Sequence, residues 1–149
     1  MGVIKAVSIS QEKGTKKTNV KEARLKEDFG IVGDVHAAGG IRQVSLLAEE
    51  SIEKMRAKGL KVNPGDFAEN ITTGGIDLLR LKVGDKLRIG EESILELTQF
   101  GKECHTRCAI YYQAGDCVMP KEGVFARVFK GGTIKPGDEI VGLDAPRPS

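Results

Sequence analysis

The sequence is short of aromatic side chains, which make up 5% of its 149 residues, and it contains no long apolar run. A transmembrane helix needs about 18 or more consecutive apolar residues, and no stretch approaches that length. The first ten residues, MGVIKAVSIS, alternate apolar and polar positions and lack the apolar block and small-residue cleavage site of a signal peptide. We therefore expect a cytoplasmic protein with no membrane partner.

The sequence also lacks a large excess of charge of either sign, since its formal net charge is +2. One local excess of lysine, formed by Lys13, Lys16, Lys17 and Lys21, lies in a polar stretch. No aromatic residue is interleaved with these lysines, so the pattern favours the solvated tip of a hairpin over a nucleic-acid interface. We expect no nucleic-acid partner.

Cysteine is scarce and odd in number, which argues against a disulfide framework in a cytoplasmic protein. All three cysteines fall within Thr98–Cys117, which reads TQFGKECHTRCAIYYQAGDC. Three interpretations are open: a reactive thiol, a metal site, or small buried side chains. The spacing C-H-x2-C-x8-C lacks the paired ligands that are typical of structural zinc sites, so zinc is disfavoured.

Cys104 is the strongest candidate for a reactive thiol. Lys102, His105 and Arg107 all lie within three residues of it. Neighbouring positive charge lowers the pKa of a thiol, and the thiolate is the form that attacks electrophiles or binds soft metals. The other two cysteines have fewer charged neighbours, and we expect them to be small buried residues.

Short alternating segments between glycine-containing turns predict a mainly β protein. Val3–Ile9 and Gly123–Lys130 alternate as strands do, and Leu79–Ile89 reads as two short strands around a Val-Gly-Asp turn. The phrases NPGDFAENI, KVGDKLRI and KPGDEIVG each place a Gly-Asp turn before an alternating strand. Ala48–Lys58 is the one clear helix, with glutamates in its first turn, basic residues near its end and Gly59 as its stop.

Strands this short, with turns roughly every eight to twelve residues, are typical of a barrel. We predict a compact, closed or nearly closed β-barrel with one clear helix and short helical turns. This single domain is expected over residues 1–144, followed by a flexible tail over residues 145–149.

Two polar constellations are candidates for binding. The first is the glycine-rich segment around Asp34, His36 and Arg42, where glycine lets backbone N–H groups approach an anion and arginine grips phosphate. The second is the adjacent pair Glu69 and Asn70, whose side chains point to opposite faces if the segment is a strand. Either one of them projects into the mouth of the barrel, or they stabilise a turn, and the sequence leaves both alternatives open.

A series of short motifs follows one another along nearly the whole chain: Gly33-Asp34-x-His36, Arg42-Gln43-Val44-Ser45-Leu46, Pro64-Gly65-Asp66-Phe67-x-Glu69-Asn70-Ile71, Leu81-x-Val83-Gly84-Asp85, Cys104, Gly123-Val124-x-Ala126-Arg127-Val128, Gly131-Gly132 and Gly137-Asp138. Each is weak alone, but the ordered set resembles a MOSC domain, the module named after the C-terminal domain of molybdenum-cofactor sulfurases. The resemblance implies a compact β-barrel-like fold. It also implies a pocket for the pterin-based molybdenum cofactor (molybdopterin) and a cysteine that carries sulfur or ligates the metal.

Matched position by position, the resemblance makes Cys104 the functional cysteine, either as a sulfur carrier or as a ligand of molybdenum. The dianionic phosphate on the pterin needs arginine, lysine or backbone N–H partners. The residues expected at the cofactor are His36, Arg42, Glu69, Asn70, Lys102, Arg107 and Arg127. One departure from the family pattern is Glu103, which stands where relatives commonly have proline.

The implied function is binding of the molybdenum cofactor, with transfer of sulfur or cofactor through the reactive cysteine. Two alternatives are a molybdenum-dependent oxidoreductase that reduces N-hydroxylated compounds, and a non-enzymatic module that delivers cofactor to another enzyme. A cysteine desulfurase or a molybdoenzyme is the expected partner. Pyridoxal phosphate is not expected, because the chain lacks the aminotransferase-like domain of full sulfurases.

Overall fold

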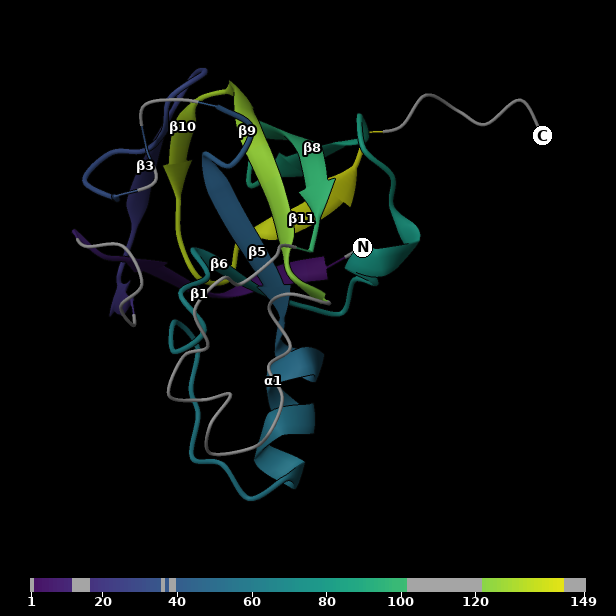
Figure 1. The fold of residues 1–149 in the computed structure, drawn as a ribbon. Helices are drawn as coiled ribbons and strands as arrows, with labels where there is room; N and C mark the ends of the chain where they lie inside the picture. The colour runs from purple at the N-terminus through teal and green to yellow at the C-terminus, as the bar shows by residue number, and fades with distance from the viewer. Residues whose placement is uncertain (1, 12–16, 36, 38–39, 102–121, 144–149) are drawn as a thin grey trace.

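The computed structural model describes residues 2–11, 17–35, 37, 40–101 and 122–143, and all elements named below lie within these ranges. Strand is the main secondary structure of the described residues, and seven of the strands close into a barrel (Figure 1). Around the barrel their order is β11-β7-β8-β9-β5-β6-β1, and β11 pairs with β1 to complete the ring. Their bounds are β1 Gly2–Ile9, β5 Val44–Ala48, β6 Ile71–Gly74, β7 Lys86–Ile89, β8 Ser93–Phe100, β9 Val124–Lys130 and β11 Glu139–Gly142. The predicted mainly β barrel is confirmed.

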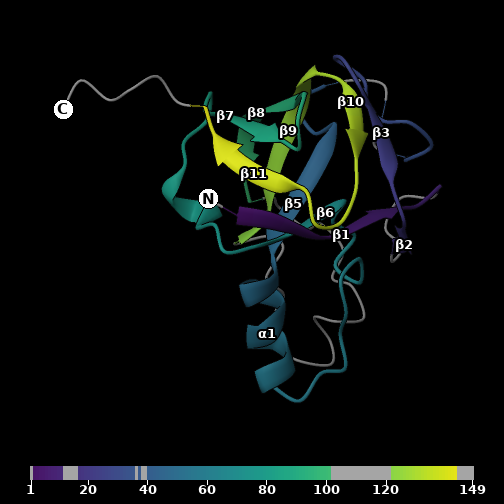
Figure 2. The same ribbon diagram turned by 180° about the vertical axis from the view of Figure 1, so that it is seen from behind.

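Four further strands lie outside the ring of seven. β2 (Thr18–Val20) pairs with the end of β1, and β3 (Ala23–Lys26) lies between β4 (Gly30–Ile31) and β10 (Gly132–Ile134) in a separate three-stranded sheet. The view from behind shows this small sheet on the opposite side of the barrel from β7 and β11 (Figure 2). The two-residue strand β4 lies just before Asp34, at the start of the glycine-rich segment.

One α-helix, α1 (Glu49–Ala57), follows β5 and leads towards β6. β5 and β6 run parallel, and a parallel pair needs a crossover connection rather than a tight turn. Helix α1 is the first part of that connection. In both views the helix projects below the barrel (Figures 1 and 2). Acidic residues lie in its first turn, and Lys54 and Arg56 in its last, as expected for the helix dipole. Among the described helices, none has both the length and the apolar character that a membrane span requires.

The apolar residues form two clusters on opposite faces of the barrel wall. Inward-facing residues of the strands, such as Leu46, Val124 and Ala126, fill the barrel. Their sequence neighbours Leu47 and Phe125 face outward and pack with residues of α1 and the segment that follows it. This is the alternation of side chains expected along a strand. The outer face of β5 and β9 therefore carries a second, smaller core.

The strand predicted at the start of Leu79–Ile89 is wrong, because a short 3-10 helix, η1 (Leu78–Arg80), occupies that position. Backbone bonds from Arg80 N–H to Asp77 O (3.2 Å) and from Leu81 N–H to Leu78 O (3.2 Å) define it. Only one residue of its first turn, Leu78, is buried, while Leu79 is half exposed. A strand would have turned alternate residues towards the core, whereas here Leu78 and the partly buried Leu81, three residues on, pack together with it. The second predicted strand of the pair is present as β7.

Candidate functional site

The glycine-rich segment leads into β5, and its arginine lies on the outer face of the barrel. Arg42 Nε donates a hydrogen bond to Gln99 Oε1 at 3.1 Å. Its guanidinium carbon lies 5.4 Å from the centre of the Phe125 ring, within the range of a cation–π contact. Phe125 is opposite Gln99 in the β8–β9 ladder, so the three side chains come from three neighbouring strands or strand ends. His36, the other predicted ligand of this segment, lies outside the described residues.

An irregularity in β8 aims two consecutive side chains at this segment. The pairing with β9 shifts between Leu97, which faces Ala126, and Gln99, which faces Phe125. The Thr98 hydroxyl donates to the Ile41 carbonyl, and Gln99 binds the next residue of the chain. Neighbouring residues of a regular strand point to opposite faces, and a bulge is a common way to re-aim a side chain. Sequence reasoning missed Gln99, since nothing in the alternating pattern of SILELTQF signals the shift.

The cysteine-rich stretch leaves the barrel next to this contact. Gly101 N–H donates to Gly123 O at 2.6 Å, which brings the two ends of the connection between β8 and β9 together. Gln99 Nε2 donates to the Gly101 carbonyl at 2.8 Å. Cys104, Lys102 and Arg107 fall in residues 102–121, outside the described residues, so their predicted roles stay predictions.

The pair Glu69 and Asn70 is buried, and the described contacts give both residues a structural role. The Glu69 carboxylate accepts from Gly65 N–H (3.0 Å), from Phe67 N–H (3.2 Å) and from Thr72 Oγ1 (2.9 Å). Burial raises the pKa of Glu69 above its ordinary value, although these donors act in the opposite direction. Glu69 therefore stabilises the turn that precedes β6, one of the two alternatives that the sequence left open.

Asn70 joins three strands of the barrel through its side-chain amide. Its Oδ1 accepts from the Ser45 backbone N–H (3.0 Å) and from Ser45 Oγ (3.1 Å), and its Nδ2 donates to the Ser8 carbonyl (3.1 Å). Ser45 is opposite Phe125 in the β5–β9 ladder. Asn70 binds Ser45 and Arg42 contacts Phe125, so the two residues contact neighbouring members of one cross-strand pair. Whether Glu69 or Asn70 also contacts a cofactor stays a prediction.

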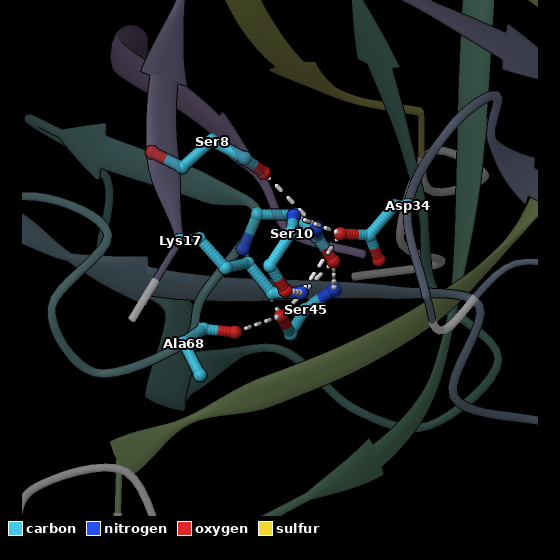
Figure 3. A network of polar contacts seen from close by, with 7 residues as sticks. Ser8, Ser10, Lys17, Asp34, Ser45 and Ala68 are labelled. Carbon is cyan, nitrogen blue, oxygen red and sulfur yellow. Dashed lines mark hydrogen bonds and ion pairs between the residues drawn. The ribbon is translucent and has the colours of Figure 1, made fainter. Parts of the chain in front are cut away.

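A buried ion pair ties the glycine-rich segment to the barrel (Figure 3). Lys17 Nζ is 2.8 Å from Asp34 Oδ1, and both side chains are 0% exposed. Lys17 Nζ also donates to Ser10 Oγ (3.1 Å), and Asp34 Oδ1 accepts from Ser10 N–H (3.0 Å). The Lys17 backbone N–H donates to Gly65 O at 2.8 Å. Lys17 therefore connects Ser10, Asp34 and Gly65, the first two through its amine and the third through its backbone.

The expectation that Lys17 lies on a solvated hairpin tip is wrong. A charged amine is buried only where a partner compensates its charge, and Asp34 supplies that charge. Lys21 is exposed, whereas Lys13 and Lys16 lie outside the described residues. Sequence reasoning missed the buried pair because Asp34 follows Lys17 by 17 positions and no periodicity links them.

Arg127 lies further along the outer face of β9, two residues beyond Phe125. Its guanidinium is partly exposed and forms an ion pair with Glu96, with Nε 2.5 Å from Oε1. The hydrogen bond to Glu96 raises the pKa of Arg127, so its positive charge is secure. Residues two apart on a strand share a face, so Arg127 and the Arg42–Phe125 contact belong to the same side of the sheet.

A cavity of about 420 Å³ lies elsewhere, between α1 and η1. Glu122 lies in its wall, accepting from Ser51 Oγ (2.6 Å) and pairing with Lys54 Nζ (3.1 Å). The remaining charged residues of its wall, Glu50 and Asp77, are acidic. A dianionic phosphate is repelled by such a wall, so this cavity does not suit the predicted ligand. Within the described ranges no group of three or more His, Cys, Asp or Glu side chains is placed to hold a metal ion.

The family model described as MOSC domain matches residues 33–141. No curated protein matches the sequence.

Solved structures share the fold. The YuaD protein from Bacillus subtilis has a TM-score of 0.77 and 18% identity, with 94% of each chain covered. YiiM from Geobacillus stearothermophilus has a TM-score of 0.70 and 18% identity, covering 97% of this chain and 76% of that one. YiiM from Escherichia coli has a TM-score of 0.65 and 19% identity, covering 97% and 71%.

Proposed function

Because the chain belongs to the MOSC domain family, we propose that it binds the molybdenum cofactor and carries sulfur or the cofactor itself through Cys104. The family suggests a function related to the molybdenum cofactor, and the role of the cysteine is the further step proposed here. One observation carries the proposal: Arg42 is held at the point where the chain leaves the barrel towards Cys104. The link runs from Arg42 through Gln99 to Gly101, three residues before the cysteine in the sequence.

The chemistry of the available side chains fits the cofactor. Arginine binds phosphate through a planar fork of N–H donors, and Arg42 presents such a fork on the outer face of the barrel. A thiolate is a soft ligand of the kind that sulfur-rich metal centres accept, and an extended chain reaches about 11 Å over the three residues from Gly101 to Cys104. When bound, the cofactor supplies a metal centre that accepts such sulfur.

The other predicted residues have supporting parts in this proposal. Arg127 adds a second cation on the same face of β9, and Lys102 and Arg107 add charge within the cysteine stretch. His36 is a candidate donor from the glycine-rich segment. Glu69 and Asn70 hold the wall in shape: Glu69 through the turn before β6, and Asn70 through its bonds to β1 and β5. Phosphate affinity is therefore proposed to depend chiefly on the arginines.

The test is the cofactor content of protein purified from cells that synthesise the cofactor. Molybdenum is measured by mass spectrometry and pterin by fluorescence, in the wild type, in Cys104→Ala and in Cys108→Ala as a matched cysteine control. We expect the wild type and Cys108→Ala to retain both, and Cys104→Ala to lose molybdenum. Equal and negligible content in all three proteins would overturn the proposal.

The loaded protein also separates the carrier function from the alternative of an oxidoreductase. An N-hydroxylated substrate with an electron donor is the assay, and the carrier function predicts no turnover by the wild type. Turnover that disappears in Cys104→Ala would assign the oxidoreductase function instead.

A further inference from the structure

We propose that Gln99 is a positioning residue that fixes the Arg42 guanidinium for an oxyanion at the start of the cysteine stretch. This inference rests on the proposed function in one respect, since it identifies that oxyanion as the phosphate of the cofactor. The anion site itself is argued from the contacts of Gln99, Arg42 and Gly101 alone.

The two hydrogen-bond partners of the Gln99 amide determine which of its atoms is the oxygen and which is the nitrogen. Arginine has only donors, so the atom that faces Arg42 Nε at 3.1 Å must be the amide oxygen. A carbonyl only accepts, so the atom that faces Gly101 O at 2.8 Å must be the amide nitrogen. One planar side chain thus fixes both a guanidinium and a backbone peptide. The shifted β8–β9 pairing between Leu97 and Gln99 gives Gln99 this aim, as bulges near functional sites often do.

Arg42 differs from other arginines of the described chain in how its charge is compensated. Arg56, Arg88 and Arg127 each form an ion pair with a glutamate. Arg42 instead donates Nε to a neutral amide and rests against the Phe125 ring. Within the described residues its two Nη groups carry no hydrogen bond, so they present an uncompensated bidentate fork.

The same amide couples this fork to the root of the cysteine stretch. Both backbone polar groups of Gly101 are hydrogen-bonded: its N–H donates to Gly123 O, and its carbonyl accepts from Gln99 Nε2. Its φ of 70° lies in the left-handed region, where residues other than glycine are strained. A ligand anion on Arg42 is therefore bound beside a peptide whose direction determines where the chain towards Cys104 begins.

The experiment uses sulfate as a probe, because its charge stays constant over mildly acidic and neutral pH. Sulfate affinity is measured by NMR titration, following the Arg42 Nε–H and Gly101 N–H signals, in the wild type, Gln99→Met, Gln99→Glu and Arg42→Met. Arg88→Met is the control for loss of an arginine elsewhere, one that is paired with a glutamate. Circular dichroism and thermal unfolding verify that each variant is folded.

The expected order of affinity follows from the contacts. Gln99→Met removes one preorganising hydrogen bond and should weaken sulfate binding about twofold to tenfold. Gln99→Glu keeps an acceptor for Arg42 Nε but neutralises the guanidinium, so it should weaken binding further. That added loss should shrink as the pH falls towards the ordinary glutamate pKa of about 4.3, a pH profile that a purely structural role would not produce. Arg42→Met should abolish binding, and Arg88→Met should leave it unchanged.

Two results would overturn the inference: wild-type affinity in Gln99→Met, or equal affinity of folded Gln99→Glu and wild type at neutral pH. These failures are distinct from failure of the proposed function. If the purified protein holds molybdenum and pterin while the Gln99 variants bind sulfate normally, the positioning role is wrong and the function stands. If sulfate binding changes as expected while the protein never acquires pterin, the anion site stands and its assignment to the cofactor phosphate is wrong.

Discussion

Replacing Lys17 with methionine tests whether the buried ion pair with Asp34 holds the glycine-rich segment in place. Methionine preserves the length and apolar stem of the side chain but removes the ammonium group, which lies 2.8 Å from Asp34 Oδ1. Both side chains are 0% exposed, so water does not screen the charge that remains on Asp34. Removing one partner of a buried ion pair is strongly destabilising, at a typical cost of about 3–5 kcal/mol.

This loss is large compared with the stability of an ordinary domain, which is about 5–15 kcal/mol. For a chain of this length it corresponds to a fall in Tm of about 6–20 °C. The assay is urea unfolding followed by circular dichroism, with Lys135→Met as the control. Lys135 also pairs with an aspartate, Asp138, but its side chain is 64% exposed, so its loss should cost less than about 1 kcal/mol.

A second variant, Asp34→Asn, distinguishes the energy of the ion pair from the energy of side-chain packing. Asp34→Asn retains an oxygen that can accept from Ser10 N–H while removing the negative charge. The double variant Lys17→Met/Asp34→Asn removes both charges of the pair, so a coupling energy of about 1–3 kcal/mol is expected. Strictly additive single-variant losses, or equal urea midpoints for Lys17→Met and Lys135→Met, would refute the reasoning.

Three further predictions concern the turn before β6 and the amide network behind it. Gly65→Ala should lower the free energy of unfolding in urea more than Gly137→Ala. Both glycines have φ near +95° (94° and 95°), so the backbone strain is similar. An added Cβ at Gly65 would lie 2.5 Å from a backbone oxygen, whereas at Gly137 it meets nothing within 4 Å. Equal losses of stability in the two variants would contradict this prediction, because the close contact at Gly65 would then cost nothing. Burial raises the pKa of Glu69, so its contribution to stability is full below the unfolded-state pKa of about 4.3 and is lost as pH rises through the raised folded-state pKa. The free energy of unfolding of the wild type relative to Glu69→Gln should therefore fall as pH rises through this window, and a constant difference would contradict the assignment. Asn70→Ala should lower the free energy of unfolding by about 2–4 kcal/mol, because it leaves the buried Ser45 N–H without its acceptor, and a loss below about 1 kcal/mol would contradict the role of the amide.

The elements that the sequence predicts well are those determined by local chemistry. Helix α1 was expected at Ala48–Lys58 and occupies Glu49–Ala57, because its charges suit the helix dipole and glycine follows it. The alternation of Gly123–Lys130 predicted β9, together with its two faces, as Val124 and Phe125 show by packing into different clusters. Leu78–Arg80 was predicted wrongly because a short apolar stretch is compatible with either a strand or a helical turn.

The candidate site was predicted only in part, for a related reason. The ordered motifs identified Arg42 as a candidate anion ligand, but its partners Gln99 and Phe125 come from strands more than fifty positions away. The pair Glu69 and Asn70 was identified from its polarity between apolar residues. That both side chains are occupied within the fold became evident only from their contacts with the turn, β1 and β5.

Sequence alone was sufficient for the barrel class, for helix α1 and for the family, because alternation, capping and ordered motifs depend on residues that are close together in the sequence. Only the tertiary structure decided that Lys17 is buried against Asp34 and that the β8 irregularity aims Gln99 at Arg42. Burial of a charge and the register of two strands depend on which distant segments meet. No local pattern carries that information, because the energy of such contacts exists only once the chain has folded.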